Sequence, residues 1–167
     1  MTTLLRLFVV ALAAAFCAGC AYRVGPTSTM NVRSIAVPNF HNRTFEPRIS
    51  VQVTTAVIKR IQTDGSIRVV SEDGADATLT GDIVSWQREP LLFRSDNTLV
   101  AKQYQLNIQA HVVLTDNRTG KRLLEGDYIG KTQYFFGNDM TQAERQAFPL
   151  AAEDLARRIT DRIVDAW

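Results

Sequence analysis

The side chains that most often carry catalysis or bind metals are few and scattered in this chain. The two histidines, His41 and His111, lie far apart in the sequence, and neither has a second histidine or cysteine at metal-ligand spacing. His111 falls on the polar side of an alternating segment, where a solvated or hydrogen-bonded role is expected. His41 belongs to a loop with no evident partner. The sequence therefore predicts no metal site.

The acidic residues show no pairing of the kind that general acid and base catalysis uses. Asp73, Asp76, Asp82 and Asp96 lie near expected turns and strand ends, and turn chemistry explains them. There is no nucleophile elbow and no phosphate-binding glycine loop. We therefore expect a protein that is not an enzyme and needs no cofactor.

Cys20 is the residue best placed for covalent chemistry. Residues 1–19 combine one positive charge, an apolar run and a small residue before the cut, which together make an export signal. The apolar run is shorter than the roughly 20 residues of a membrane-spanning helix. Ala18-Gly19-Cys20 resembles the lipobox of bacterial lipoproteins, in which the cysteine receives a lipid before cleavage. The alternative is an ordinary signal peptide with a free cysteine near the cut.

The residues after the cut indicate where the chain is held. Stable anchoring needs more than one acyl chain, and a triacylated Cys20 meets that need. Ala21 follows, and not the aspartate typical of inner-membrane retention, so we expect the outer membrane and its periplasmic side. Residues 20–31 then form the lipidated cysteine and a tether, and residues 32–167 form one domain. With Cys20 the only cysteine left, no internal disulfide can form.

The chain has a formal net charge of +2 and no basic run interleaved with aromatic residues, so no nucleic-acid partner is expected. A cluster of basic residues is still a candidate for ligand binding. Arg88, Arg94 and Lys102 flank the apolar segment 91–93. Cations beside exposed apolar side chains suit an amphiphile with anionic groups. Alternatively, this is a hairpin tip whose apolar residues complete the core and whose charges are solvated.

An aromatic group near the end of the chain is a second candidate. Tyr128, Tyr134, Phe135 and Phe136 lie near Lys131. Aromatic clusters mark protein interfaces, and a junction between a strand and a helix buries such residues equally well. We expect either a partner interface or part of the core.

Hydrophobic periodicity predicts the elements that position these residues. The segment 104–114 alternates apolar and polar side chains, which is typical of a strand with one covered face. Glu89-Pro90 is expected to end the strand before it. Thr141 and Glu144 form a candidate capping box for the last helix, which Pro149 is expected to divide. The predicted strands are 32–37, 67–70, 77–88, 104–114 and 121–136, the last with a bulge expected near Gly126 or Gly130, and the predicted helices run from about 49 to 64 and from 141 to 167.

The order β-α-β-β-β-β-α defines the expected fold class. We predict an α+β two-layer sandwich, with two helices packed on one face of a mixed, mostly antiparallel sheet of four to five strands. The strand at 67–70 is expected to pair parallel with the strand at 32–37.

Several segments in order resemble one family. They are Cys-Ala-Tyr at 20–22, IAVPNFHNRTFEP at 35–47, VVSEDGADATLTGDIVSWQREPL at 69–91, and the alternating strand that ends in Leu-Thr-Asp at 114–116. The chain resembles the lipopolysaccharide-assembly lipoprotein family LptE from about Cys20 to Glu125, and more loosely through the final helix. None of these segments is a catalytic motif, so the resemblance rests on their order and spacing.

The resemblance implies a role at the inner leaflet of the outer membrane. Such proteins lie partly inside the lumen of a large β-barrel partner, LptD, and act as plug and assembly factor while lipopolysaccharide passes to the cell surface. Basic residues on loops at the end of the sheet are thought to contact lipopolysaccharide, and Arg94, Lys102 and Arg88 are the nearest candidates. A plug needs a polar outer surface, which the Gln/Asn/His side of 105–111 offers if no helix covers it.

Two other functions fit a lipobox and a small domain. An activator of peptidoglycan synthases of the LpoB type shares the strand, the Asn-Arg-Thr loop and the helix, but normally needs a long tether. About eleven residues separate Cys20 from Val32 here, roughly 35 Å at full stretch. A periplasmic lipid-binding lipoprotein would need a cavity.

Overall fold

The computed structural model describes residues 32–93, 101–135 and 139–166. Predictions on residues 1–31, which include the export signal, Cys20 and the tether, lie outside the described residues, as do Arg94, Phe136 and Trp167. The strands are β1 (Ser34–Ala36), β2 (His41–Asn42), β3 (Arg68–Val69), β4 (Ala77–Phe93), β5 (Ala101–Asp116) and β6 (Arg122–Phe135); the helices are α2 (Ile49–Asp64), α3 (Met140–Asp165) and the short 3-10 turn η1 (Glu72–Gly74).

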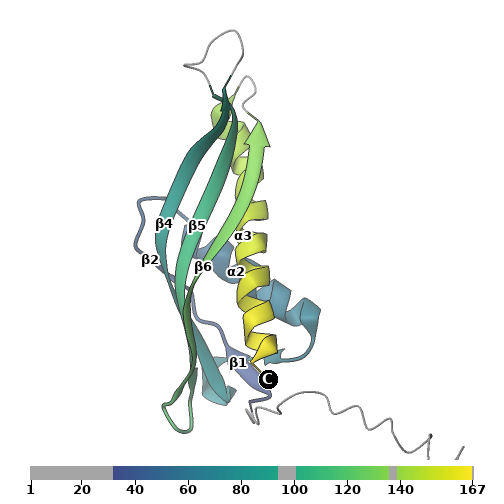
Figure 1. Cartoon of the computed structure of the whole chain (residues 1–167). Helices are drawn as coiled ribbons and strands as arrows, with labels where there is room; N and C mark the ends of the chain where they lie inside the picture. Colours follow the sequence, from purple (N-terminus) through teal and green to yellow (C-terminus); the bar gives the residue numbers. More distant parts are fainter. Residues whose placement is uncertain (1–31, 94–100, 136–138, 167) are drawn as a thin grey trace, which may run out of the picture.

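Within the described residues these strands form one six-stranded mixed sheet with the order β3-β1-β4-β5-β6, and β2 pairs with β4. β1 runs parallel to both β3 and β4, as predicted for β3, and β4, β5 and β6 are antiparallel. Figure 1 shows the three long strands as one curved layer with the helices on one side of it. The α+β sandwich is confirmed, but the strand number is one higher than expected because a two-residue parallel strand, β2, lies in the predicted loop.

The alternation in β5 places one set of side chains in the core. Leu106, Ile108, Ala110, Val112 and Leu114 are all buried. Each fully buried large apolar side chain contributes about 1.5–3 kcal/mol relative to exposure, so this row fixes which face the helices cover. The facing helix residues are also buried, and they are Ile49, Val53, Val57 and Ile61 from α2 and Ala151, Leu155, Ile159 and Ile163 from α3.

Helix α2 confirms the predicted boundaries. It ends at Asp64, and Gly65 follows with φ of 77°, a left-handed conformation in which glycine is favoured. The Gly65 N–H donates to the carbonyl of Ile61 at 3.1 Å, which satisfies one of the free carbonyls at the helix end.

Helix α3 starts differently from the prediction. Asp139 is the N-cap, and its carboxylate accepts from the N–H groups of Thr141 and Gln142. The helix also continues through Pro149 without division. A proline removes one helical hydrogen bond, and packing of the preceding residue compensates for it: Phe148 lies against Trp86 with ring centroids 5.0 Å apart.

Strand β4 does not end at Glu89-Pro90 but runs on to Phe93, with irregular register around Pro90. Beyond Ile83 the only described neighbour of β4 is β5. Proline lacks an N–H donor and is tolerated on such an edge strand.

Strand β6 shows no bulge at Gly126 or Gly130, and its register with β5 is unbroken from Phe135 to Leu124. Gly130 instead allows close packing of a helix. A β-carbon there would lie 2.6 Å from the backbone nitrogen of Leu155 and would also collide with the carbonyl oxygen of Ala151. The absent side chain therefore lets α3 lie directly on the sheet.

Candidate functional site

The side of the sheet away from the helices carries a mainly polar surface, interrupted by Val113, Ile129 and Phe135, which we call the open face. Side chains alternate along a strand and align across paired strands, so the register of β5 with β6 defines its members. They are Gln103, Gln105, Asn107, Gln109, His111 and Val113 from β5, with Glu125, Asp127, Ile129, Lys131, Gln133 and Phe135 from β6. The β5 members are half-buried by their neighbours. No described helix covers this side.

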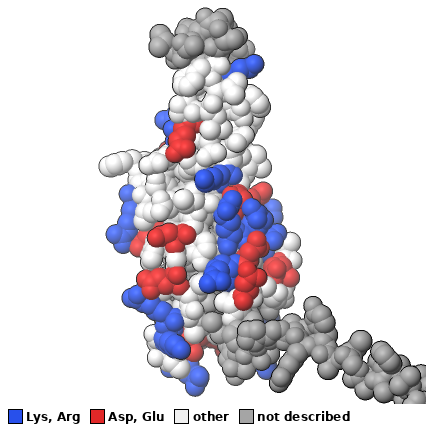
Figure 2. Space-filling view, in the orientation of Figure 1, with Lys and Arg blue, Asp and Glu red and all other residues white. Residues whose placement is uncertain are grey.

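Uncharged amides dominate the middle of the open face. Gln103 donates to Gln133 across the strands at 2.9 Å, and Gln105 donates to Asn107 at 2.9 Å. Each amide group has further donor and acceptor capacity after one such bond. Figure 2 shows white areas over the strands, with patches of Asp and Glu among them, while most Lys and Arg side chains in this view lie beside the strands or at the lower end. These amides can exchange hydrogen bonds with another polar surface, and Lys131, opposite Asn107, adds one positive charge to the middle of the open face.

His111 is the titratable centre of the open face. Its Nδ1 lies 2.9 Å from Asp127 and its Nε2 lies 3.4 Å from Glu125. The hydrogen bond with Asp127 is the main reason that the pKa of His111 is raised above its usual value. The hydrogen-bonded role expected for this histidine fits these contacts.

A titration checks this arrangement. We expect His111 to titrate above 6.5, and Asp127→Asn to bring its pKa back toward 6.5. A pKa raised by folding stabilises the protein below 6.5, and this contribution is lost as pH rises through the folded-state pKa. Proton NMR of the imidazole measures both variants, and a midpoint below 6.5 in the native chain contradicts the contacts.

The far ends of β4 and β5 carry the predicted basic group. Arg88 donates to Glu144 of α3 at 3.2 Å, so its charge is partly neutralised. Lys102 is exposed, on the same side of β5 as Leu106. The apolar residues between them are exposed and do not complete the core, and they are Leu91, Leu92 and Phe93.

The aromatic residues of β6 do not form one patch. Tyr134 is only 7% exposed and stacks on Tyr104, whereas Phe135 points to the open face and is 65% exposed. Tyr128 packs partly against the core. Burial raises the pKa of both tyrosines. Phe135 is thus the described member of this group that is available to a partner.

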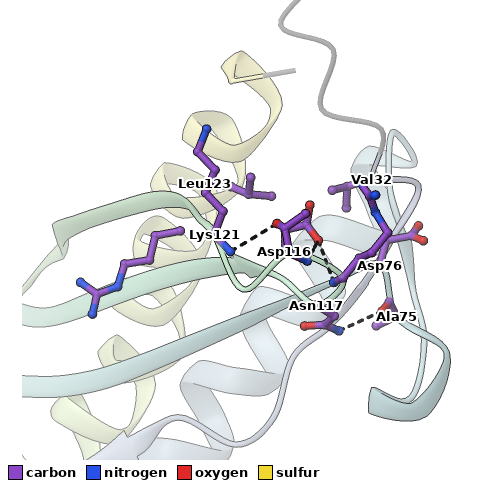
Figure 3. Close-up of a pocket in the computed structure, with 10 residues that line it drawn as sticks. Val32, Ala75, Asp76, Asp116, Asn117, Lys121 and Leu123 are labelled. Atoms are coloured by element: carbon purple, nitrogen blue, oxygen red, sulfur yellow. Dashed lines mark hydrogen bonds between the residues drawn. The ribbon is translucent and has the colours of Figure 1, made fainter.

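A hollow of about 640 Å³ lies at the opposite end of the sheet, beside the turn between β5 and β6. Figure 3 shows that the Asn117 side-chain amide donates a hydrogen bond to the carbonyl of Ala75, and that the Asp116 N–H donates one to the carbonyl of Lys121. The carboxylate of Asp76 accepts from the N–H groups of Arg33 and Ser34 and from the Ser34 hydroxyl, and the Arg33 bond is the main cause of its lowered pKa. These groups stabilise the turn. Seven of the ten residues that line the hollow are polar or charged, whereas a lipid cavity is expected to be lined mainly by apolar side chains.

The described residues contain neither a metal-binding cluster nor a membrane-spanning helix. No three His, Cys, Asp or Glu side chains among residues 32–93, 101–135 and 139–166 could hold a metal ion together. Neither long helix within those ranges combines the length and the apolar content that crossing a membrane requires.

The fold is a two-layer α+β module in which the described helices leave one side of the sheet uncovered. The family model described as lipopolysaccharide-assembly, LptE, matches residues 32–165. The chain therefore belongs to the LptE family, as its sequence resemblance predicted. Among curated proteins no relative matches the chain.

Solved structures support the fold. The chain is similar to protein XCC0632 from Xanthomonas campestris, with a TM-score of 0.58 and 10% identity over 81% of this chain and 85% of that one. It is also similar to a minor lipoprotein from Acinetobacter baumannii, with a TM-score of 0.52 and 14% identity over 80% and 93% of the two chains. A third similar structure is a candidate lipoprotein from Caulobacter crescentus CB15, with a TM-score of 0.53 and 18% identity over 75% of this chain and 88% of that one. At these identities the likeness concerns the fold alone.

Proposed function

We propose that this protein is a lipid-anchored, non-enzymatic component of lipopolysaccharide transport that acts as plug and assembly factor in an outer-membrane β-barrel of the LptD type. Membership of the lipopolysaccharide-assembly family supports a role in lipopolysaccharide transport. The observation that carries the plug role is the open face. The lumens of large barrels are polar, and a row of amides on β5 can hydrogen-bond to such a wall.

The placement of the domain follows from its anchor. We propose that residues 1–19 are removed, that Cys20 carries the lipid, and that residues 20–31 tether a single domain spanning 32–167. About eleven residues between Cys20 and Val32 keep the domain within roughly 35 Å of the lipid. A protein held so close to the outer membrane on its periplasmic side can insert into a barrel from below.

Affinity capture from solubilised outer membranes tests the proposal. The mature, lipidated chain should recover a large β-barrel protein in near-stoichiometric amount. Recovery of a peptidoglycan synthase instead would support the LpoB-type activator and contradict the plug. Recovery of lipid with no protein partner would support a lipid-binding lipoprotein.

We also propose that the far end of β4 and β5 contacts lipopolysaccharide. Lys102 is exposed there, with Leu91, Leu92 and Phe93 close by in the strands. Arg94 follows Phe93 directly in the sequence and lies outside the described residues. Arg88 contributes less, because it is paired with Glu144.

Charge reversal tests this contact. The double variant Arg94→Glu, Lys102→Glu should bind purified lipopolysaccharide at least ten-fold more weakly, because two charge-assisted contacts to phosphates become repulsive. Fluorescence titration measures binding. The double variant Arg118→Glu, Lys121→Glu, at the opposite end of the sheet, is the matched control and should bind normally. Unchanged binding of the first variant removes this pair from the proposal.

A further inference from the structure

Phe45 has the most exposed large apolar side chain of the described residues, at 107% of the reference area. It lies in the segment between β2 and α2, residues 43–48, which we call the Phe45 loop. No described residue covers the ring, so burial contributes nothing to its place in the fold. Its position therefore needs an explanation other than packing.

The Phe45 loop is held by hydrogen bonds on both sides of the exposed ring. The Asn42 side-chain oxygen accepts from the N–H and the hydroxyl of Thr44, at 2.8 and 2.7 Å. The Asn42 amide donates to the carbonyl of Glu46 at 2.8 Å, and the Glu46 N–H donates to the Thr44 hydroxyl at 3.2 Å. Three of these bonds tie the residues flanking Phe45 to the Asn42 side chain, and the fourth joins the two flanking residues to each other.

The loop is also attached to the sheet and the core. The Arg43 N–H donates to the carbonyl of Ile83 at 3.0 Å, and the Arg43 guanidinium pairs with Asp82 at 2.9 Å. Phe40, just before β2, is buried against the backbone of Gly81. The exposed ring is thus displayed on a pre-organised support, which lowers the entropy cost of binding.

The position of the loop relates the ring to the open face. Asp82 lies opposite His111 in the register of β4 with β5, so the Arg43–Asp82 ion pair marks the border between the loop and the open face. Val84 is also exposed next to Ile83, at 40%. The Phe45 loop therefore adjoins the open face along the β4 edge, and a wall lying against that face lies next to the loop.

The chemistry of the loop fits a protein pocket better than a lipid surface. Segments that insert into membranes present a broad apolar face beside basic residues. Here one ring stands alone between the Arg43–Asp82 ion pair and Glu46, with Arg48 at the end of the loop, and these residues form no broad apolar face. A single aromatic anchor with a polar rim is the usual form of a protein–protein hot spot.

We propose that Phe45 docks into an aromatic-sized apolar pocket on the wall of the barrel partner and fixes the rotational register of the plug within it. This inference rests on the proposed function, since it takes the partner from there. Amide contacts across the open face are similar in several registers, whereas one ring in one pocket selects a single register.

Quantitative capture of the barrel from outer membranes tests the inference with the full lipidated chain. Phe45→Ala should reduce recovery of the barrel at least ten-fold, and Phe45→Tyr should retain most of it. Leu150→Ala, which removes another exposed apolar side chain from α3, is the matched control and should recover the barrel normally. Thermal unfolding of Phe45→Ala should match the native chain, because no described residue buries the ring.

A photoreactive phenylalanine analogue at position 45 gives a second readout in cells. We expect a crosslink to the barrel. Crosslinks only to a second copy of this chain or to lipid overturn the inference, as does normal recovery of the barrel by Phe45→Ala. If the native chain itself recovers no barrel, the proposed function fails and the inference fails with it.

Discussion

Replacing Gly130 with alanine is expected to lower the free energy of unfolding by about 1–3 kcal/mol, the usual cost of overpacking a well-packed core. The new methyl group would meet backbone atoms of α3 at Ala151 and Leu155, which cannot move aside as a side chain can. The helix must therefore retreat from β6 and open gaps against the buried residues of β5. Urea unfolding followed by circular dichroism measures the change.

Gly126→Ala is the matched control on the same strand. The atoms nearest to a β-carbon at Gly126 would be those of the Tyr128 side chain, at 3.4 Å or more, which is ordinary van der Waals contact. Its free energy of unfolding should stay within about 0.5 kcal/mol of the native value. Equal stabilities of the two variants would show that α3 does not rely on Gly130 for its approach.

Replacing Cys20 with serine is expected to move the protein from the membrane fraction to the soluble fraction almost completely. Serine cannot receive the thioether-linked lipid, and each buried methylene of an acyl chain is worth about 0.8 kcal/mol. Fractionation of cells followed by immunoblotting measures the distribution, and metabolic labelling with a fatty-acid analogue measures the lipid.

Cys17→Ser is the control for this change, because Cys17 leaves with the export signal. That variant should remain lipidated and membrane-bound. Continued lipid labelling of Cys20→Ser, or equal loss from both variants, would favour an ordinary signal peptide over a lipobox.

The regular strands and helices could be predicted because the spacing of apolar residues along the chain indicates which side chains are buried. The two-residue period of β5 and the four-residue spacing of α2 each identify one apolar face. The predictions of strand boundaries were wrong where contacts between distant elements decide the local structure. Pro90 stays in a strand because β4 is an edge there, and β2 exists only because β4 lies beside it.

Local signals also compete at the start of α3. Asp139 and Thr141 are both good N-cap residues, and the sequence does not say which carboxylate or hydroxyl meets free N–H groups. The structure selects Asp139. Glu144, the expected capping-box partner of Thr141, pairs with Arg88 of β4 instead.

The candidate site was predictable only in part. The amide row of β5 was visible in the sequence, but whether a helix covers it depends on which way the sheet faces. The engagement of Arg88 by Glu144 joins two elements far apart in the chain. Phe45 carries no periodic signal, since its exposure depends on bonds made by Asn42 and Thr44.

The central claim is that the open face lies against the wall of a β-barrel, and a comparison of barrel recovery tests it most directly. Capture from outer membranes would be done with the native chain and with Asn107→Trp, which places a bulky ring in the middle of the amide row. Asn107 is half-exposed on the solvent side, so the fold should tolerate the change. The account predicts a large barrel protein with the native chain and at least ten-fold less with the variant; equal recovery by both chains would contradict it.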